Sequence, residues 1–504
     1  MELSGFHPAV ERWFRGAFTA PTSAQAQGWE HIAAGQHTLI EAPTGSGKTL
    51  AAFLWCLNDL VCQPPAGDSV QVLYISPLKA LNNDIQRNLE APLAGIRQAA
   101  AELGCDTPEL RIDVRTGDTP GSSRQRQIRR PPHIFITTPE SLYLLLTSSR
   151  AQGMFRSLRY VILDEIHAVA STKRGVHLAL SLERLAELGV SPIRIGLSAT
   201  VRPLETVAQL LGGYDDDGAE RPVSIVRAEQ DKRIELAISY PFGDAEDDGD
   251  FMHRTARLVL AEAAQHRSTL VFCNARHVTE RLSEVINEEA GQEVALAHHG
   301  SISREKRLET ELALKEGRLP LLIATSSLEL GIDVGAVDFV LQIGSTRSVS
   351  RVLQRVGRAG HQVGAVSRGR MIARHASDLL DAAATGRGVR QRAIEPVHIP
   401  QLCLDVLAQH IVAMAANHPL LADDVLRVAR RSQPFHTLSR PQLDNVLAML
   451  AGRFRDVRFE GLRPRLEYDD DTGEIRARPG ALRLAVISGG TIPDRGYLAV
   501  ELLP

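Results

Sequence analysis

The sequence predicts an α/β protein with two parallel-sheet lobes, followed by a mainly helical region. Short apolar, β-branched runs alternate with longer amphipathic stretches, and this alternation occurs twice along the 504 residues. Strands that are apolar along their whole length are typical of parallel sheets covered by helices on both faces. The alternation stops near residue 395, which separates the lobes from the rest of the chain. A chain of this length is also expected to form more than one domain.

Nine apolar runs are the predicted strands of the two lobes. In the first lobe they are Thr38–Ile40, Val70–Ile75, Ile134–Ile136, Tyr160–Leu163 and Ile193–Leu197. In the second they are Thr269–Phe272, Val294–Ala297, Leu319–Ala324 and Phe339–Ile343. Amphipathic stretches such as Leu50–Val61 and Leu178–Leu188 predict the helices between strands. We expect the lobes to join near Ile225–Tyr240, between acidic, glycine-rich stretches typical of surface loops.

Three helices and a hairpin are predicted after the second lobe. Apolar residues at helical spacing predict one helix from Leu402 to Met414 and another around Val425 and Val428. A third begins at a capping box, Ser439-Arg440-Pro441-Gln442, and ends near Leu450. Two short strands, Arg465–Tyr468 and Glu474–Ala477, flank an Asp-Asp-Thr-Gly turn. This order predicts a winged helix.

The predicted domains are residues 1–228, 229–395, 396–480 and 481–504. The last segment contains runs of strand character, Ala485–Ile487 and Tyr497–Leu503, and is expected to begin a further β-containing domain that the chain does not complete.

Composition excludes several classes of protein. No apolar run approaches the roughly 18 residues of a membrane span, and no export signal precedes the first lobe. Five scattered cysteines without a C-x-x-C pair argue against a disulfide framework or a zinc site and favour the reducing cytoplasm. The net charge of −3 neither indicates nor excludes a nucleic-acid partner, and no particular oligomeric state is predicted.

The sharpest motif follows the first predicted strand. It is Ala42-Pro43-Thr44-Gly45-Ser46-Gly47-Lys48-Thr49. Glycines let backbone N–H groups close on phosphates, and the start of the following helix adds positive potential. Lys48 is expected to reach the β- and γ-phosphates of ATP, and Thr49 to hold Mg²⁺.

Two adjacent carboxylates end the strand Tyr160–Leu163. Asp164 is predicted to bind Mg²⁺, and Glu165 to act as the base that polarises the attacking water. Ser198-Ala199-Thr200 follows the next strand, where its hydroxyl groups are expected to bond the carboxylate motif and report the state of the nucleotide.

The second lobe carries a hydroxyl-rich turn and a pair of arginines. In the turn, Thr325 and Ser326 are expected to bond phosphate oxygens, and Asp333 a ribose, beside Gly331. Arg355 and Arg358, one helical turn apart, are predicted to converge on a γ-phosphate held by the first lobe. A nucleotide kinase or small GTPase would not have this second lobe.

Together these motifs resemble the DExH-type helicases of superfamily 2, with Asp164-Glu165-Ile166-His167 as the box. Three further segments resemble the large helicase-related (Lhr) family. They are Phe18–Gln25, Ser76–Asp84 and Arg347–Arg351 with Gln354–His361, and the segment Ser488–Gly496 supports the same resemblance. It implies two RecA-like lobes, with ATP and Mg²⁺ as cofactors.

The resemblance also implies residue roles. Gln25 would read the adenine edge, and Thr44, Gly45, Ser46, Gly47 and His167 would complete the ATP site. Residues implied to touch a single strand are Ser76, Pro77, Lys79, Thr138, Pro139, Asn274, Arg276, His299, Thr325, Ser326 and Ile492.

The implied activity is 3′–5′ translocation on single-stranded DNA, with unwinding of DNA or RNA–DNA duplexes in DNA repair. Two alternatives stay open: a DExH RNA helicase, and a shortened nucleic-acid-binding fragment that does not unwind.

Overall fold

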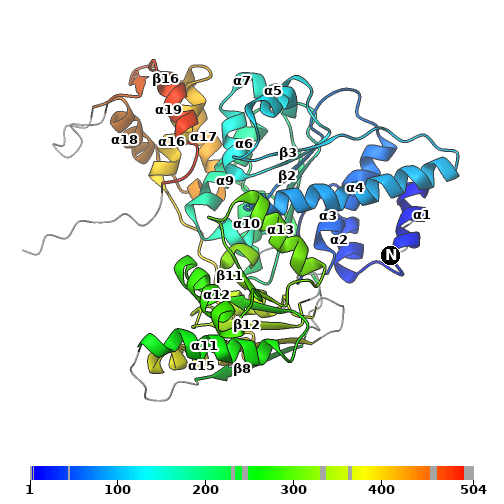
Figure 1. Ribbon diagram of the computed structural model, residues 1–504. Coiled ribbons are helices and arrows are strands. Elements are labelled where there is room, and N and C mark those ends of the chain that lie inside the picture. Colours follow the sequence, from blue (N-terminus) through cyan, green and yellow to red (C-terminus); the bar gives the residue numbers. More distant parts are fainter. Residues whose placement is uncertain are drawn as a thin grey trace, which may run out of the picture.

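The computed structural model describes residues 3, 5–43, 46–228, 233–240, 248–329, 337–360, 366–453 and 463–492. Two sheet-containing lobes and a third, mainly helical unit make up the molecule, and the third unit lies beside lobe 1 (Figure 1). The predicted two-lobe α/β architecture with a winged helix is confirmed. Among the helices within these ranges, none has the length and apolarity of a membrane span.

Lobe 1 contains a seven-stranded parallel sheet. Its order is β3 (Ile112–Arg115), β4 (Ile134–Thr137), β2 (Val72–Ile75), β5 (Tyr160–Leu163), β6 (Ile193–Ser198), β1 (His37–Glu41) and β7 (Val223–Arg227). The central strands are buried on both faces. Because the strands are parallel, their carboxyl ends meet at one edge, where the motifs gather.

Helices cover both faces of this sheet. One hydrophobic cluster packs α1 (Pro8–Ala17), α2 (Ser23–Ala33), α3 (Lys48–Cys62) and α4 (Lys79–Glu102) on one face. A second cluster packs helices that include α6 (Pro139–Leu146), α7 (Ser149–Gln152), α8 (His167–Ala170), α9 (Lys173–Ala186) and α10 (Leu204–Gly212) on the other. The remaining helix, α5 (Gly121–Arg129), follows edge strand β3.

Lobe 2 contains a six-stranded parallel sheet. Its order is β10 (Ala295–His298), β11 (Leu321–Ala324), β9 (Thr269–Phe272), β12 (Phe339–Ile343), β13 (Ser367–Ile372) and β8 (Ile234–Ser239). Its helices are α11 (Asp248–Ala263), α12 (Arg276–Ala290), α13 (Arg304–Lys315), α14 (Val349–Val356) and α15 (Ala376–Gln391). Separate apolar clusters lie on the two faces.

The third unit is a winged helix. Its elements are α16 (Leu404–Ala415), β14 (Leu420–Leu421), α17 (Ala422–Arg431), α18 (Arg440–Leu450), β15 (Leu466–Tyr468), β16 (Glu474–Ala477) and α19 (Ala481–Ile487). The predicted capping box at Ser439 and Gln442 is present. The hairpin pairs antiparallel, and β14 adds to it.

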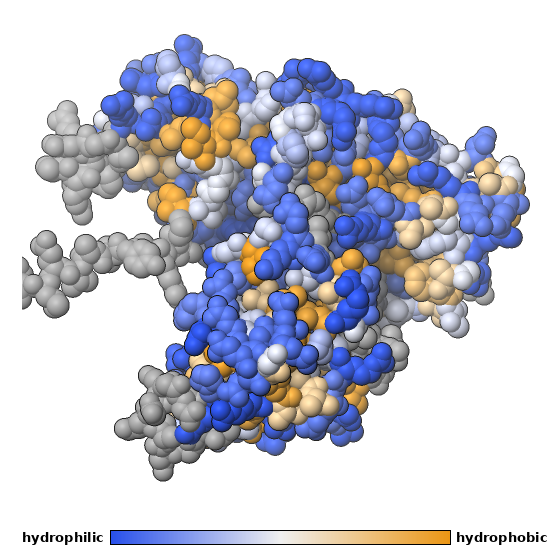
Figure 2. Space-filling model, in the orientation of Figure 1, coloured by the Kyte–Doolittle hydropathy of each residue, from blue (hydrophilic) through white to orange (hydrophobic). Residues whose placement is uncertain are grey.

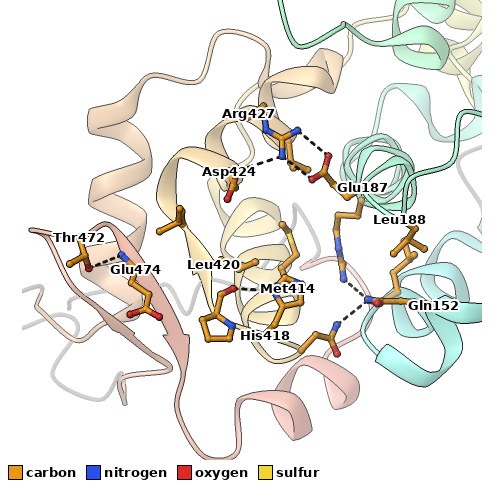
Figure 3. Close-up of a pocket in the computed structure, with 16 residues that line it drawn as sticks. Gln152, Glu187, Leu188, Met414, His418, Leu420, Asp424, Arg427, Thr472 and Glu474 are labelled. Atoms are coloured by element: carbon orange, nitrogen blue, oxygen red, sulfur yellow. Dashed lines mark hydrogen bonds and ion pairs between the residues drawn. The ribbon is translucent and has the colours of Figure 1, made fainter.

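The winged helix shares a hydrophobic cluster with lobe 1. Tyr143, Val176 and Leu180 of lobe 1 belong to the same buried cluster as residues of α16, α17 and α18. Beside this contact, a cavity of about 490 Å³ lies between α9 and the winged helix (Figure 3). Figure 2 shows an apolar area on the outside of the winged helix, where Leu482, Val486 and Ile487 of α19 are exposed.

Two connections cross between the lobes. The first runs from β7 to β8, with residues 229–232 outside the described ranges. The second returns from lobe 2: Arg202 and Pro396 form a bridge, and Val397 donates a hydrogen bond of 2.7 Å to the Arg202 carbonyl. The chain then enters the winged helix.

The nine predicted strands of the lobes and the two of the hairpin are confirmed, and five strands were missed: β3, β7, β8, β13 and β14. The join expected near Ile225–Tyr240 therefore contains the outer strand of each lobe. The expectation of a strand at Ala485–Ile487 is wrong, because these residues belong to helix α19. Ala481 and Ala485, four residues apart, are buried on the same helical face against the winged-helix core. The expected strand at Tyr497–Leu503 lies outside the described residues.

Candidate functional site between the lobes

The phosphate-binding loop lies between β1 and α3. Helix α3 begins at Lys48, preceded by Gly47 in a left-handed conformation with φ +78°. Ser46 closes the turn by donating a hydrogen bond of 2.7 Å from Oγ to the Pro43 carbonyl. Thr44 and Gly45 lie outside the described residues. The geometry is the strand–turn–helix that the motif predicts.

Lys48 is buried, and its Nζ has no hydrogen-bond partner within the described part of the chain. Burying an unpaired ammonium group is costly, so a ligand of opposite charge is expected there. A phosphate at the start of α3 would supply that partner. The loop therefore fits the nucleotide that the sequence predicts.

Gln25 packs against this loop. Its Oε1 accepts a hydrogen bond of 2.9 Å from the backbone of Thr22, and its Nε2 lies 3.5 Å from the Gly47 carbonyl. A Cβ at position 47 would lie 2.6 Å from the Gln25 Nε2, so this packing needs glycine. The structure thus brings Gln25 to the nucleotide site, while its contact with adenine stays a prediction.

The carboxylates of Asp164 and Glu165 follow β5, and both are buried. Tyr74 donates a hydrogen bond to one Asp164 oxygen, and the Glu165 N–H donates one of 2.7 Å to the other. Glu165 adopts φ +48°, which is uncommon outside glycine and is a form of strain that clusters at functional sites.

The charges around the two carboxylates separate their pKa values. Burial, and next the charge of Glu165, raise the pKa of Asp164. Burial would also raise the pKa of Glu165, but the positive charges around it, of which Lys48 contributes most and Arg358 also contributes, outweigh burial and hold that pKa below its ordinary value. Glu165 is therefore ionised at neutral pH, as a base must be.

His167 connects the carboxylates to Ser198-Ala199-Thr200. Its Nδ1 accepts a hydrogen bond of 3.2 Å from the Ala199 N–H and lies 3.5 Å from a Glu165 oxygen. Burial is the main cause that lowers the pKa of His167, which favours the neutral ring needed to accept that bond. The hydroxyl of Ser198 donates to the Ala199 carbonyl, so the bond that joins the two motifs here comes from the backbone.

The arginines of lobe 2 have different surroundings. The charge of Arg358 contributes to lowering the pKa of Glu165 in lobe 1. Its guanidinium also donates a hydrogen bond of 2.9 Å to the Glu329 carbonyl. Arg355 donates to the Glu329 carboxylate at 2.9 and 3.2 Å and to Gln342 Oε1 at 2.7 Å. Both arginines are buried and bonded to Glu329 of lobe 2; the charge of Arg358 also acts on Glu165 of lobe 1, and Arg355 lies in the wall of the cleft between the lobes.

A cleft of about 720 Å³ lies between the lobes next to these groups. Lobe 1 contributes Leu78, His167 and Thr200 to its wall, and lobe 2 contributes Asn274, Thr325, Ser326 and Arg355. Sequence-predicted groups for nucleotide and for strand thus meet in one cleft. Gly331 and Asp333 lie outside the described residues.

Four predicted strand contacts lie at the carboxyl edge of the lobe 1 sheet. Ser76 is buried and accepts a hydrogen bond from the Leu78 N–H, while the Pro77 carbonyl accepts one from Arg174. Thr138 caps α6 through Ser141, and Pro139 opens that helix. The side chain of Lys79, the first residue of α4, is outside the described set.

The lobe 2 contacts lie at the corresponding edge of its sheet. Asn274 follows β9 and donates to the Ser345 carbonyl at 2.9 Å. Arg276 begins α12 and donates to Ser301 at 2.8 Å, and the buried His299 Nε2 lies 2.9 Å from Glu280. Ile492, beyond α19, is 62% exposed. Contact of these residues with a strand stays a prediction.

Sequence reasoning missed two residues of the site. Tyr74 bonds Asp164 across 90 positions, and Glu329 pairs with Arg355 across 26. No local motif marks Tyr74, because it looks like any apolar residue of strand β2. Glu329 lies in the hydroxyl-rich turn that contains Thr325 and Ser326. A lone carboxylate in this turn, 26 residues before Arg355, was the one sequence feature that could have indicated the ion pair.

Family models match most of the chain. The DEAD/DEAH box helicase model matches residues 22–209, and the helicase conserved C-terminal domain matches residues 252–362. The winged helix domain of large helicase-related protein matches residues 387–504. These three ranges follow the two lobes and the winged helix in order.

Three known proteins show how far the similarity extends. "Lhr helicase/ probable uracil glycosylase" of Mycolicibacterium smegmatis is 46% identical, covering 99% of this chain and 35% of that protein. "ATP-dependent helicase Lhr-Core protein 2" of Thermococcus barophilus is 41% identical, covering 98% of this chain and 58% of that protein. A solved structure of Mycobacterium smegmatis helicase Lhr bound to ssDNA and AMP-PNP matches with a TM-score of 0.89 and 48% identity, over 99% of this chain and 64% of that one.

The chain thus spans between about a third and three-fifths of the length of these curated relatives. Within that span the motifs occur in the predicted order on the predicted fold, and the charges of Lys48 and Arg358 both act on the buried Glu165. The chain belongs to the large helicase-related (Lhr) family of superfamily 2 helicases.

Proposed function

We propose that this chain hydrolyses ATP in the cleft between its lobes and uses the closure of the lobes to move along single-stranded DNA. One observation carries the proposal: the positive charges of Lys48 in lobe 1 and of Arg358 in lobe 2 both lower the pKa of the Glu165 carboxylate. Cationic groups from two lobes therefore face one catalytic carboxylate. A solved Lhr relative bound to ssDNA and AMP-PNP supports the same ligands here.

Each residue has a distinct role in this proposal. Lys48 and the N–H groups at the start of α3 hold the phosphates, and Thr49 and Asp164 hold Mg²⁺, which supplies charge neutralisation when bound. Glu165, kept ionised, accepts a proton from the attacking water. Arg358 neutralises charge that develops on the transferred phosphate.

Lobe closure follows from the placement of the cations. Lys48 and Arg358 act on the same phosphate chain from opposite walls, so the closed arrangement is favoured while both are engaged. Loss of one contact after hydrolysis removes that bias. If the strand contacts of the lobes differ between the two arrangements, each cycle moves the lobes along the strand.

The finer assignments rest on the family resemblance. They are 3′–5′ polarity, unwinding of DNA or RNA–DNA duplexes, a role in DNA repair and a place in the cytoplasm. The domain limits 1–228, 229–395, 396–480 and 481–504 are part of the same proposal. The strand path would follow the carboxyl edges of both sheets, from Ser76 and Thr138 to Asn274 and Thr325.

The test is ATP hydrolysis by the purified 504-residue chain with and without single-stranded DNA. Glu165→Gln removes the base and is expected to lower stimulated turnover by about 10²–10⁴-fold. Lys48→Ala is expected to lose turnover together with nucleotide binding. The matched controls are Glu90→Gln on α4 and Lys306→Ala on α13, both exposed positions that should keep full activity.

Circular dichroism confirms that each variant is folded. Wild-type turnover in folded Lys48→Ala or Glu165→Gln would contradict the proposed site. Single-stranded RNA is the comparison nucleic acid, and stronger stimulation by RNA would favour the RNA helicase alternative. Strand separation is measured in parallel on a DNA duplex and an RNA–DNA hybrid, which distinguishes a helicase from a strand-binding ATPase.

A further inference from the structure

Strand β8 leaves one edge of the lobe 2 sheet open. Among the residues that the structure describes, it pairs with β13 alone, and it is the last strand in the sheet order. Ser367 donates to the Arg233 carbonyl and Ala373 to the Ser239 carbonyl, so odd-numbered residues of this strand face β13. Because backbone groups alternate along a strand, Ile234, Leu236 and Ile238 direct their N–H and C=O groups outward. An open edge of this kind is a template for another strand.

A groove of about 540 Å³ runs between β8 and helix α15. The three outward residues of β8 are only partly buried, and their side chains pack against the lobe core on the α15 side. The helix comes close at Gly386, where an added Cβ would lie 2.5 Å from Ile238 Cδ1. The groove therefore has an apolar floor beside unpaired backbone.

Arginines form the rim of this groove. Arg387 and Arg390, both exposed, lie one turn apart on α15, and neither makes an ion pair with another residue in the part of the chain that the structure describes. Arg233 and Arg392 also line it. Arg233 already pairs with Glu235 at 3.2 Å, so the exposed guanidinium groups of Arg387 and Arg390 are the ones that favour carboxylates of a ligand.

We propose that this groove binds an acidic, extended segment of a partner protein, which adds to β8 as a seventh strand. Alternate residues of a strand are about 6.6 Å apart, and residues three apart on a helix surface are about 5–6 Å apart. Carboxylates at alternate positions can therefore pair with Arg387 and Arg390 in turn. Main-chain bonds to β8 supply affinity, and the arginines supply selectivity for acidic sequences.

A nucleic acid fits this groove less well than a peptide. Single strands bind to platforms of aromatic side chains, and none of the residues described as lining the groove is aromatic. The lobe 2 residues assigned to the strand, Asn274, Arg276 and His299, follow β9 and β10. Strands β12 and β13 separate β9 from β8, so the groove lies at the opposite edge of the sheet.

The experiment measures binding of a fluorescein-labelled nonapeptide of alternating aspartate and valine to the full chain by fluorescence anisotropy. The double variant Arg387→Glu/Arg390→Glu should weaken binding at least about tenfold, since charge-assisted hydrogen bonds are lost. Arg281→Glu, an exposed arginine of α12, is the matched control and should bind like the wild type. DNA-stimulated ATP hydrolysis should be unchanged in both variants.

Two further arms test the strand and the partner. The same peptide is also made in two methylated forms, one blocking the odd-numbered and one the even-numbered backbone N–H groups. Both forms keep their charges, but only one loses the N–H groups that face β8, and only that form should lose binding. The triple variant Asp244→Asn, Glu246→Gln and Asp247→Asn should not change affinity. Stronger peptide binding by this variant would mean that the chain's own acidic segment competes with the peptide for the groove. That result would contradict the proposal that a partner protein occupies it.

Other results would also overturn the proposal. They are equal binding of a lysine–valine peptide, binding that survives charge reversal, and full binding by both methylated peptides. An equal loss of single-stranded DNA binding in Arg387→Glu/Arg390→Glu would assign the groove to the nucleic-acid path instead.

Discussion

Arg355 and Arg358 lie one helical turn apart, yet their guanidinium groups have different partners. Arg355 is 3% exposed and forms two hydrogen bonds with the buried carboxylate of Glu329, over the face of Phe272. Removing one partner of a buried ion pair leaves the other charge without compensation, which costs far more than an exposed pair contributes. We therefore expect Arg355 to stabilise lobe 2 through Glu329, and we propose Arg358, whose charge lowers the pKa of Glu165, as the arginine that acts in catalysis.

We expect Arg355→Ala and Arg358→Ala to affect different measurements. Arg355→Ala should lower the free energy of unfolding by about 3–5 kcal/mol, because the buried Glu329 loses both hydrogen bonds and the exposed Arg351, 4.0 Å away, compensates its charge only weakly. Arg358→Ala should reduce kcat by about 10³-fold or more, as for other arginine fingers. Denaturant unfolding and steady-state ATP hydrolysis give the two values.

The double variant Arg355→Ala/Glu329→Ala serves as the control. It should be more stable than the sum of its single variants predicts, because the uncompensated charge is gone. Additive losses would contradict the pairing. Equal loss of kcat in both arginine variants would restore the original expectation of two converging fingers.

At the residue scale, the sequence predicted groups that carry their own local signal. The phosphate loop, Asp164-Glu165 and the arginine pair are short motifs, and their chemistry follows from residue type. The partners of Arg355 are different, since Glu329, Gln342 and Asn274 come from three separate segments that only the folded sheet brings together. Residue spacing alone could not separate the roles of Arg355 and Arg358.

Helix α6 joins the edge of lobe 1 where contacts with a nucleic-acid strand are predicted to the winged helix. Its first turn is capped by Thr138, a predicted strand contact. At its other end the Leu146 carbonyl accepts three hydrogen bonds, from Gln152 at 2.9 Å, Arg184 at 3.0 Å and Asn417 of the winged helix at 3.3 Å. The donors satisfy a helix-end carbonyl that has no partner within the helix.

Two buried histidines lie at the same interface. His177 of lobe 1 and His410 of α16 have ring centroids 4.7 Å apart, with Arg184, Glu140 and Tyr143 around them. Burial is the main cause that lowers the pKa of His177 to about 4 and that of His410 well below its ordinary value. Both rings are therefore neutral in the folded protein at neutral pH.

We expect the docked winged helix to lose stability as the pH falls. Histidines in the unfolded chain take up protons below about pH 6.5, whereas in the folded chain His177 resists protonation down to about pH 4 and the pKa of His410 is also well below its ordinary value. Their contribution is thus complete above pH 6.5 and is lost between pH 6.5 and 4. His177→Phe/His410→Phe should flatten this part of the curve of Tm against pH, and His277→Phe, at an exposed position, should not. Parallel curves for the wild type and the double variant would contradict this account.

At the element scale, the sequence predicted strands with uniform apolar runs and missed those with mixed ones. Strands β3, β8 and β13 carry charged residues, and β3, β7 and β8 lie at sheet edges where polar residues are tolerated. Helix α19 was predicted as a strand because Val486 and Ile487 are β-branched. Burial of Ala481 and Ala485 on one helical face overrides that weak preference.

At the scale of the whole molecule, lobe 1 and the winged helix form one body. Besides the shared cluster, Arg431 of α17 contacts the backbone and side chain of Glu183 and also pairs with Glu187. Glu183 is 1% exposed and is held by Arg194 and Arg221 as well. This network fixes α17 against α9.

We expect residues 1–395 alone to expose the apolar surface that the winged helix covers. Tyr143, Val176 and Leu180 are at most 1% exposed in the full chain and would become solvent-accessible. Exposed patches of this kind cause association. The shortened chain should bind a hydrophobic dye and elute as larger species in size-exclusion chromatography. Val176→Ser/Leu180→Gln in the shortened chain should reverse this, and an unmodified monomer without dye binding would contradict the shared core.

The bridge between Arg202 and Pro396 has a consequence for how lobe 2 moves. The chain leaves lobe 1 after β7 and returns to it at this bridge, so lobe 2 is tethered to one rigid body at both of its ends. A body held at two points can rotate about the line that joins them, whereas its twisting and sliding are restricted. Lobe 2 should therefore swing along one arc, and the distance covered per ATP would be set by the angle of that arc and the length of the lobe.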